Sequence, residues 1–249
     1  MRKVLTLIAA PALALAFMAS PAQADTTKPT PGAPCEPGGG QGTGNPCNGN
    51  NGNPSPEGNA NKEKVKFDKN PDPFTIARPG NDRGAFVTQI GEANEGTIAQ
   101  SNGQQYADIR QSGDANRAGV IQSGAGDHYA LVTQAGDTND LGLDQSGAGT
   151  KVALLQQQGN GNRMTVGQSG AGASSGVAAS QLGNDNLLSL LQDGSDNQAL
   201  LTQNGSGNAM TAVQNGGGNQ LIWTQNGDNL SDLSITQDGG AALQVTQSR

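Results

Sequence analysis

The feature that most constrains this chain is a glutamine that recurs every 11 or 12 residues through its C-terminal two thirds. A Gly usually follows two positions after this Gln and an Asn often follows five positions after it, as in QNGSGNAMTAVQ from Gln203. A fixed period of this kind indicates repeats that stack on their neighbours. The series, with one gap of 13 and one of 10, is Gln89, Gln100, Gln111, Gln122, Gln134, Gln145, Gln157, Gln168, Gln181, Gln192, Gln203, Gln214, Gln225, Gln237 and Gln247.

The residue types within each unit predict a strand and a turn. An 11-residue period also suits a right-handed coiled coil, but each unit carries one to three glycines, and a glycine inside a helix costs about 1 kcal/mol. Apolar residues alternate after the Asn, as at Leu188 and Leu190 or at Leu221 and Trp223, which indicates one face of a strand. The Gly-x-x-Asn segment supplies residue types that tolerate a tight bend.

Differences between the units show how they pair. Asn follows the Gln in every second unit of the first half, whereas the units from Gln122, Gln145 and Gln168 read QSGAG. From Gln181 to Gln225 every unit carries an Asn four or five positions after the Gln. A rung of two strands, 22 to 23 residues long, accounts for both halves. We therefore predict an all-β protein, a β-solenoid of about seven stacked two-strand rungs over residues 85–249.

Stacking places like side chains ~4.8 Å apart, so columns of identical amides can hydrogen-bond along the stack. Such ladders satisfy buried amides that would otherwise be costly to bury. The residues predicted to form ladders and to carry polymerisation are Gln89, Asn94, Gln111, Asn116, Gln134, Asn139, Gln157, Asn162, Gln181, Asn186, Gln192, Asn197, Gln203, Asn208, Gln214, Asn219 and Gln225.

The N-terminal part is predicted to be organised differently. Arg2 and Lys3, an apolar run to residue 18 and a small-residue site at 22–24 predict a signal peptide over residues 1–24. Residues 25–84 are rich in Pro, Gly and Asn and are expected to be disordered, with Phe67, Phe74 and Ile76 as candidates for docking onto the repeats.

The predicted export has consequences for the two cysteines and for whether the chain spans a membrane. An oxidising compartment permits a disulfide between Cys35 and Cys47. The apolar run is shorter than the ~20 residues of a membrane span, and no later segment approaches that length. We expect an exported chain with no membrane span.

Charge and chemistry disfavour several function classes. From Phe86 onward the chain has five basic and fourteen acidic residues, which disfavours nucleic acid. The one histidine, His128, is expected to be a surface residue in a turn rather than part of a triad. We expect no enzyme activity and no catalytic, cofactor or metal site.

Two other solenoid functions are kept as alternatives. Calcium-binding repeats have a nine-residue period and ligating Asp residues, whereas GGGNQL and GNGNRM carry Asn in a longer period. An ice-binding face needs an outward row of Thr. Such a row, interrupted by residues such as Arg110 and Asp144, precedes the glutamines at Thr88, Thr133, Thr202, Thr224, Thr236 and Thr246.

The units resemble a known family. QNGSGNAMTAVQ, QDGSDNQALLTQ, QSGDANRAGVIQ and QIGEANEGTIAQ are similar to the curlin repeat of bacterial curli fibres, Gln-x-Gly-x-x-Asn-x-Ala-x-x-x-Gln. The resemblance covers about 160 residues. It implies a secreted amyloid subunit of a Gram-negative bacterium that forms adhesive extracellular fibres of the biofilm matrix. The implied partners are other copies of the chain, a curli-type nucleator or major subunit, and the outer-membrane curli secretion machinery. Major, nucleating and accessory roles all remain open.

The ends of a solenoid bear on assembly. Both ends are expected to present open strand edges, which template further strands. Residues 203–229 carry a single charge, Asp228, and we predict that this segment templates fibre growth.

Overall fold

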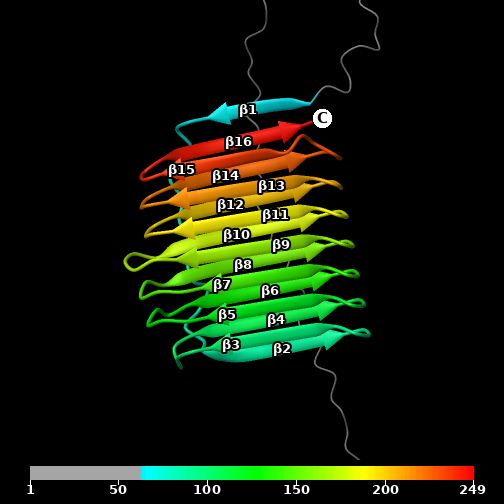
Figure 1. The fold of residues 1–249 in the computed structure, drawn as a ribbon, viewed down its shortest axis with the longest axis vertical. Helices are drawn as coiled ribbons and strands as arrows, with labels where there is room; N and C mark the ends of the chain where they lie inside the picture. Colours follow the sequence, from blue (N-terminus) through cyan, green and yellow to red (C-terminus); the bar gives the residue numbers. More distant parts are fainter. Residues whose placement is uncertain (1–62) are drawn as a thin grey trace, which may run out of the picture. The chain divides into compact units, whose positions relative to one another are not determined.

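The repeats fold into two facing β-sheets that stack rung upon rung (Figure 1). The computed structural model describes residues 63–249, and these residues contain no helix. Their strands are β1 Lys64–Asp68, β2 Gly84–Ile90, β3 Glu95–Gln100, β4 Tyr106–Ser112, β5 Arg117–Gln122, β6 Tyr129–Ala135, β7 Asp140–Gln145, β8 Lys151–Gln158, β9 Arg163–Ser169, β10 Ser175–Leu182, β11 Leu187–Asp193, β12 Gln198–Asn204, β13 Ala209–Asn215, β14 Gln220–Asn226, β15 Leu233–Asp238 and β16 Ala242–Ser248.

The strand order confirms the predicted solenoid. Sheet A has the order β1-β16-β14-β12-β10-β8-β6-β4-β2, and sheet B has the order β15-β13-β11-β9-β7-β5-β3. From β2 onward the chain alternates between the sheets, so each even-numbered strand and the odd-numbered strand after it form one rung. Seven rungs run from β2–β3 to β14–β15, and β16 adds one more strand to sheet A.

The register aligns the periodic glutamines. All neighbouring strands from β2 to β16 pair in parallel, with Gln181 opposite Gln203 and Gln192 opposite Gln214 as examples. Because a shift of one residue would turn every inward side chain outward, this register fixes which residues form the core.

The core is narrow and lies between the two sheets. Alternate residues of the strands from β2 to β16 point into it, among them Leu188, Met210, Leu221 and Trp223, all fully buried. The Trp223 indole N–H donates a hydrogen bond to Oε1 of Gln247 at 3.0 Å. The apolar residues that alternate in the sequence are therefore the ones whose side chains point into the core.

Residues 63–83 differ from the sequence-based expectation. The sequence predicted disorder up to residue 84, but β1 pairs antiparallel with β16 at the C-terminal end of the stack. An extended strap, residues 69–83, then leads along the stack to β2 (Figure 1). Chain entropy, on which the prediction rested, is offset here by pairing with an otherwise open strand edge.

The strap makes a few specific contacts with sheet A. The backbone N–H of Ile76 donates to Oε1 of Gln198 at 2.9 Å, and the Arg78 guanidinium lies 5.7 Å from the centre of the Tyr129 ring. Ile76 and Phe74 are half-buried, whereas Phe67 is 59% exposed and does not serve as a docking residue. The predicted signal peptide, residues 25–62 and both cysteines lie outside the described residues.

The turns stack too closely to admit a side chain at their first glycine. Gly136 has a φ of 110°, and a Cβ there would lie 2.2 Å from the carbonyl oxygen of Gly159 in the next rung. Gly142, in the middle of β7, has no atom within 4 Å of the same position and no positive φ. The turn glycine therefore permits the turns to stack as closely as the paired strands.

We predict that Gly136→Ala lowers the free energy of unfolding by at least about 1–3 kcal/mol, the usual strain of a residue held in this backbone region. The clash with Gly159 adds to that strain. Urea unfolding of freshly purified monomer measures the change. Gly142→Ala is the matched control, and an equal loss in both variants would contradict the role of close stacking.

Candidate functional site

Two columns of glutamine run through the interior of the stack. In both, Nε2 of each Gln donates to Oε1 of the Gln in the next rung toward the C-terminal end, at 2.7–2.9 Å. Sheet A contributes Gln89, Gln111, Gln134, Gln157, Gln181, Gln203, Gln225 and Gln247, and sheet B contributes Gln100, Gln122, Gln145, Gln168, Gln192, Gln214 and Gln237.

Each buried amide also links the two sheets. Gln203 Nε2 donates its second N–H to the carbonyl oxygen of Leu187 at 3.0 Å, and Gln192 Nε2 does the same to Gly176 at 3.1 Å. Because a carbonyl oxygen only accepts, these bonds fix which end of the side chain is nitrogen. The ladders therefore have one polarity, with N–H groups pointing to the C-terminal end.

Asparagine ladders line the turns. Asn139 Nδ2 donates to Oδ1 of Asn116 at 3.0 Å and to the Gly159 carbonyl at 2.7 Å, so one side chain joins three successive rungs. Its backbone N–H also donates to Oδ1 of Asn116, at 3.1 Å. The first Asn column follows the strands of sheet A and contains Asn94, Asn116, Asn139, Asn162, Asn186 and Asn208.

A second turn column follows the strands of sheet B and is asparagine only near its C-terminal end. There Asn219 Nδ2 donates to Oδ1 of Asn197 at 3.0 Å, and the Asn197 backbone N–H donates to Ser175 Oγ at 3.3 Å. Lower in the column the equivalent buried positions hold Lys151, His128 and Gln105. These substitutions account for the difference between the two halves of the sequence.

His128 takes the place of an asparagine, which corrects the expectation of a surface residue. Its side chain is fully buried, Nε2 donates to the Ser123 carbonyl at 2.8 Å, and Nδ1 accepts the backbone N–H of Lys151 at 3.3 Å. The signal in the sequence is its place 23 residues before Lys151, in the register of the Asn column. Burial, with a smaller contribution from the Lys151 charge, lowers the pKa of His128 below its usual 6.5, although the hydrogen bond to Ser123 and the Asp127 charge oppose the shift.

The structure places all the predicted ladder residues in these columns. The columns also contain Gln100, Gln122, Gln145, Gln168, Gln237 and Gln247, which the predicted set omitted. The first four begin units without the regular Asn, and the last two belong to the C-terminal units. The spacing of the glutamines would by itself have predicted all six. The part that any of these residues plays in polymerisation stays a prediction.

The segment predicted to template growth has no free edge in the fold. Residues 203–229 contain β13 and β14, and each of these strands pairs with a neighbour on both sides. Low charge identified a segment inside the stack rather than one at its end. The free edges lie at the ends of the stack.

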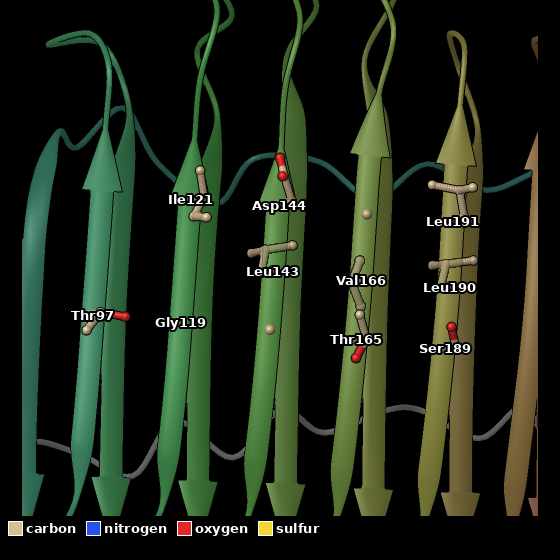
Figure 2. A pocket seen from close by; sticks show the side chains of 12 residues that line it. Thr97, Gly119, Ile121, Leu143, Asp144, Thr165, Val166, Ser189, Leu190 and Leu191 are labelled. Atoms are coloured by element: carbon tan, nitrogen blue, oxygen red, sulfur yellow. The ribbon is translucent and has the colours of Figure 1, made fainter.

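The outer face of sheet B carries a shallow groove with little polar chemistry (Figure 2). Gly119, Gly142 and Gly167 leave room along it, and Asp144 is its one charged side chain. Within residues 63–249 no three His, Cys, Asp or Glu side chains gather as a metal site would require. The same residues contain no helix long and apolar enough to cross a membrane.

Comparison with protein families identifies the repeat. The family of the curlin associated repeat matches residues 106–136 and 183–216. The chain is a curlin-repeat protein. Comparison with curated proteins and with solved structures gives no match. Curlin-repeat proteins form a family of structural fibre subunits, so the family points to a fibre component rather than an enzyme.

We predict that the free energy of unfolding falls as the pH drops below about 6.5, the ordinary pKa of histidine. The folded chain holds His128 neutral, so its stabilising contribution is complete above that pH and declines as the unfolded state takes up a proton first. Urea unfolding at pH 7.5 and pH 5.5 measures this.

His128→Asn is the matched variant, because asparagine occupies the same column at Asn197 and Asn219. Its stability should change little between the two pH values. An equal decline in the variant and the parent chain would show that His128 is not the titrating group.

Proposed function

We propose that this curlin-repeat protein is a secreted structural subunit that polymerises into curli-like extracellular amyloid fibres for surface adhesion and biofilm matrix. The observation that carries the proposal is the continuity of the amide ladders. The same Gln-to-Gln bond recurs through every rung, so another copy placed at an end could extend it without any new chemistry.

The proposal includes its route and partners. The family implies a secreted fibre subunit of a Gram-negative bacterium. Residues 1–24 have the features of a cleaved export signal, and export through the outer-membrane curli secretion machinery would follow. The partners are further copies of the chain and a curli-type nucleator or major subunit.

The charges of the outer surface suit a chain that must be delivered before it assembles. Acidic residues such as Asp114, Asp137 and Asp228 lie in exposed turns. Like charges at stacked positions slow association of unfolded copies, which is how gatekeeper residues act. The glutamine ladders are uncharged, so they add nothing to this repulsion.

The alternatives gain little from the geometry. On sheet A the outward row beside the glutamines contains Thr202, Thr224 and Thr246 in succession, but Arg110 and Gln156 interrupt it nearer the N-terminal end. An ice-binding face needs a continuous row, so the row does not favour that function. The turn ladders are built from Asn amides already paired with one another, which leaves little capacity for calcium.

Seeded assembly tests the proposal. The purified chain should show a lag followed by a rise in thioflavin-T fluorescence, fragments of its own fibres should shorten the lag, and electron microscopy should show fibres. A monomer that stays soluble and neither assembles nor speeds the assembly of another curlin-repeat protein would contradict the function.

We predict that Gln203→Ala with Asn208→Ala lengthens the lag severalfold. The change leaves the Nε2 group of Gln181 and Oε1 of Gln225 without their partners, and each unsatisfied buried group costs about 1–3 kcal/mol. Thioflavin-T kinetics at equal concentration measures the lag.

Asn204→Ala with Thr211→Ala is the control from β12 and β13, the strands on either side of the Asn208 turn, because both of these side chains point to solvent. Its lag should stay within about twofold of the parent chain. Equal lags in the two double variants would show that the interior ladder at this rung is not needed for assembly.

A further inference from the structure

The two ends of the solenoid present different edges. Among residues 63–249, β2 at the N-terminal end pairs only with β4 and β3 pairs only with β5, so both strands keep one edge free. At the C-terminal end β15 keeps a free edge, but the edge of β16 is covered by β1. One end is therefore open on both sheets and the other is open on sheet B alone.

The ends are also complementary in hydrogen bonding. At the N-terminal end, Oε1 of Gln89 and Oε1 of Gln100 accept no hydrogen bond from any residue between 63 and 249. At the C-terminal end the N–H groups of the last ladder amides have no further Gln to bind. Gln237 Nε2 donates instead to the Ala241 carbonyl and Gln247 Nε2 donates to Glu63, both at 3.0 Å. The free acceptors at the N-terminal end therefore match the N–H groups at the C-terminal end, which Ala241 and Glu63 hold until a second copy takes their place.

The number of strands decides how a second copy can fit. Apart from β1, sheet A ends at β16 and sheet B one half-rung earlier at β15. A copy in the same orientation would place its β2 on β16 and leave the position beside β15 empty. A copy turned by half a turn about the stacking axis places its β2 on β15 and its β3 on β16.

The half-turn keeps both the parallel pairing of the strands and the stacking of Gln on Gln. The chain reverses at each turn, so the strands of the two sheets run in opposite directions, and a half-turn exchanges the sheets while keeping the pairing parallel. Gln89 of the second copy then lies on Gln237, and its Gln100 lies on Gln247. A contact between different surfaces that does not close on itself produces a filament.

We propose that the C-terminal end of the solenoid is the docking surface for the first rung of a second copy of this chain, turned by half a turn, and that β1 occupies half of this surface until the second copy displaces it. The inference rests on the proposed self-assembly. It adds how two copies are oriented, and it makes the displacement of β1 from β16 the gate for assembly.

The features of β1 suit a removable cap. All five of its residues are exposed, with charges at Lys64, Lys66 and Asp68, so its removal uncovers little apolar surface of its own. Charged edge strands of this kind resist pairing with further copies. The incoming β3 would pair in parallel, as in the rest of the stack, and bring Ile98 over Val245.

Glu63 closes the ladder of sheet A at this cap. Its carboxylate accepts hydrogen bonds from Gln247 Nε2 at 3.0 Å, from the Ser231 backbone N–H at 2.9 Å and from Ser231 Oγ at 2.6 Å. The bonds from Ser231 hold the pKa of Glu63 below its usual 4.5. Because an ionised carboxylate has no N–H to donate, the amide ladder stops there.

Pairs of single-cysteine chains test the docking geometry, with Cys35→Ser and Cys47→Ser as background. The half-turn places Thr88 of one copy beside Thr236 of the next and Ala99 beside Thr246, about 4.8 Å apart, which is within reach of a disulfide. Mixtures of Thr88→Cys with Thr236→Cys, and of Ala99→Cys with Thr246→Cys, should give disulfide dimers on a non-reducing gel after assembly and oxidation.

The contrary results are distinct. Cross-linking of Thr88→Cys with Thr246→Cys instead would mean a copy without rotation and would overturn the geometry. Dimers from the first mixture but not from the second would show that β1 stays in place and would overturn the gate. If no fibres form at all, the proposed function itself fails.

A reversible lock tests the gate separately. Lys66 lies opposite Thr246, so Lys66→Cys with Thr246→Cys joins β1 to β16 within one chain. The oxidised chain should elongate seeds at least tenfold more slowly than the reduced chain. Leu191→Cys with Val213→Cys, which joins β11 to β13 inside the stack, is the control and should elongate equally in both states. Equal elongation of the locked chain would overturn the gate.

Discussion

The structure depends on the hydrogen bonding of buried glutamine. An isolated amide in an apolar interior would be costly, yet each ladder Gln from Gln111 to Gln225 has its carbonyl oxygen and both N–H groups engaged, by the rungs on either side and by the opposite sheet. This satisfaction requires the same residue at the same place in every rung. The strict period of the sequence, the parallel register and the narrow core all follow from that requirement.

The same interaction gives the stack a direction. The second N–H of each amide is bound to a carbonyl of the facing sheet, so the ladder cannot reverse locally without losing that bond. Directional ladders make the two ends chemically different. The chain therefore carries, in its interior bonding, the complementarity that a head-to-tail assembly needs, and β1 modifies one end of it.

The turn columns show how far a repeat can depart from its pattern. Asn serves because its side chain both accepts a backbone N–H and donates to the next turn. His128 reproduces the acceptor with Nδ1, and Ser175 reproduces it with Oγ, so the position needs that one function more than it needs an amide. Composition alone made His128 look like a surface residue, because burial depends on the register of the rungs rather than on residue type.

The sequence by itself determined the all-β class, the two-strand rung, the inward residues such as Leu188 and Trp223, and the interior columns, because glycine in every unit disfavours the helix that the same period would otherwise allow. Only the tertiary structure decided which edges are free. Residues 203–229 look suited to templating but are paired on both sides, whereas β1, from a segment that composition marks as disordered, covers β16. The physical reason is that local pattern sets how a strand bonds, while its position in the stack sets whether its edge is already occupied.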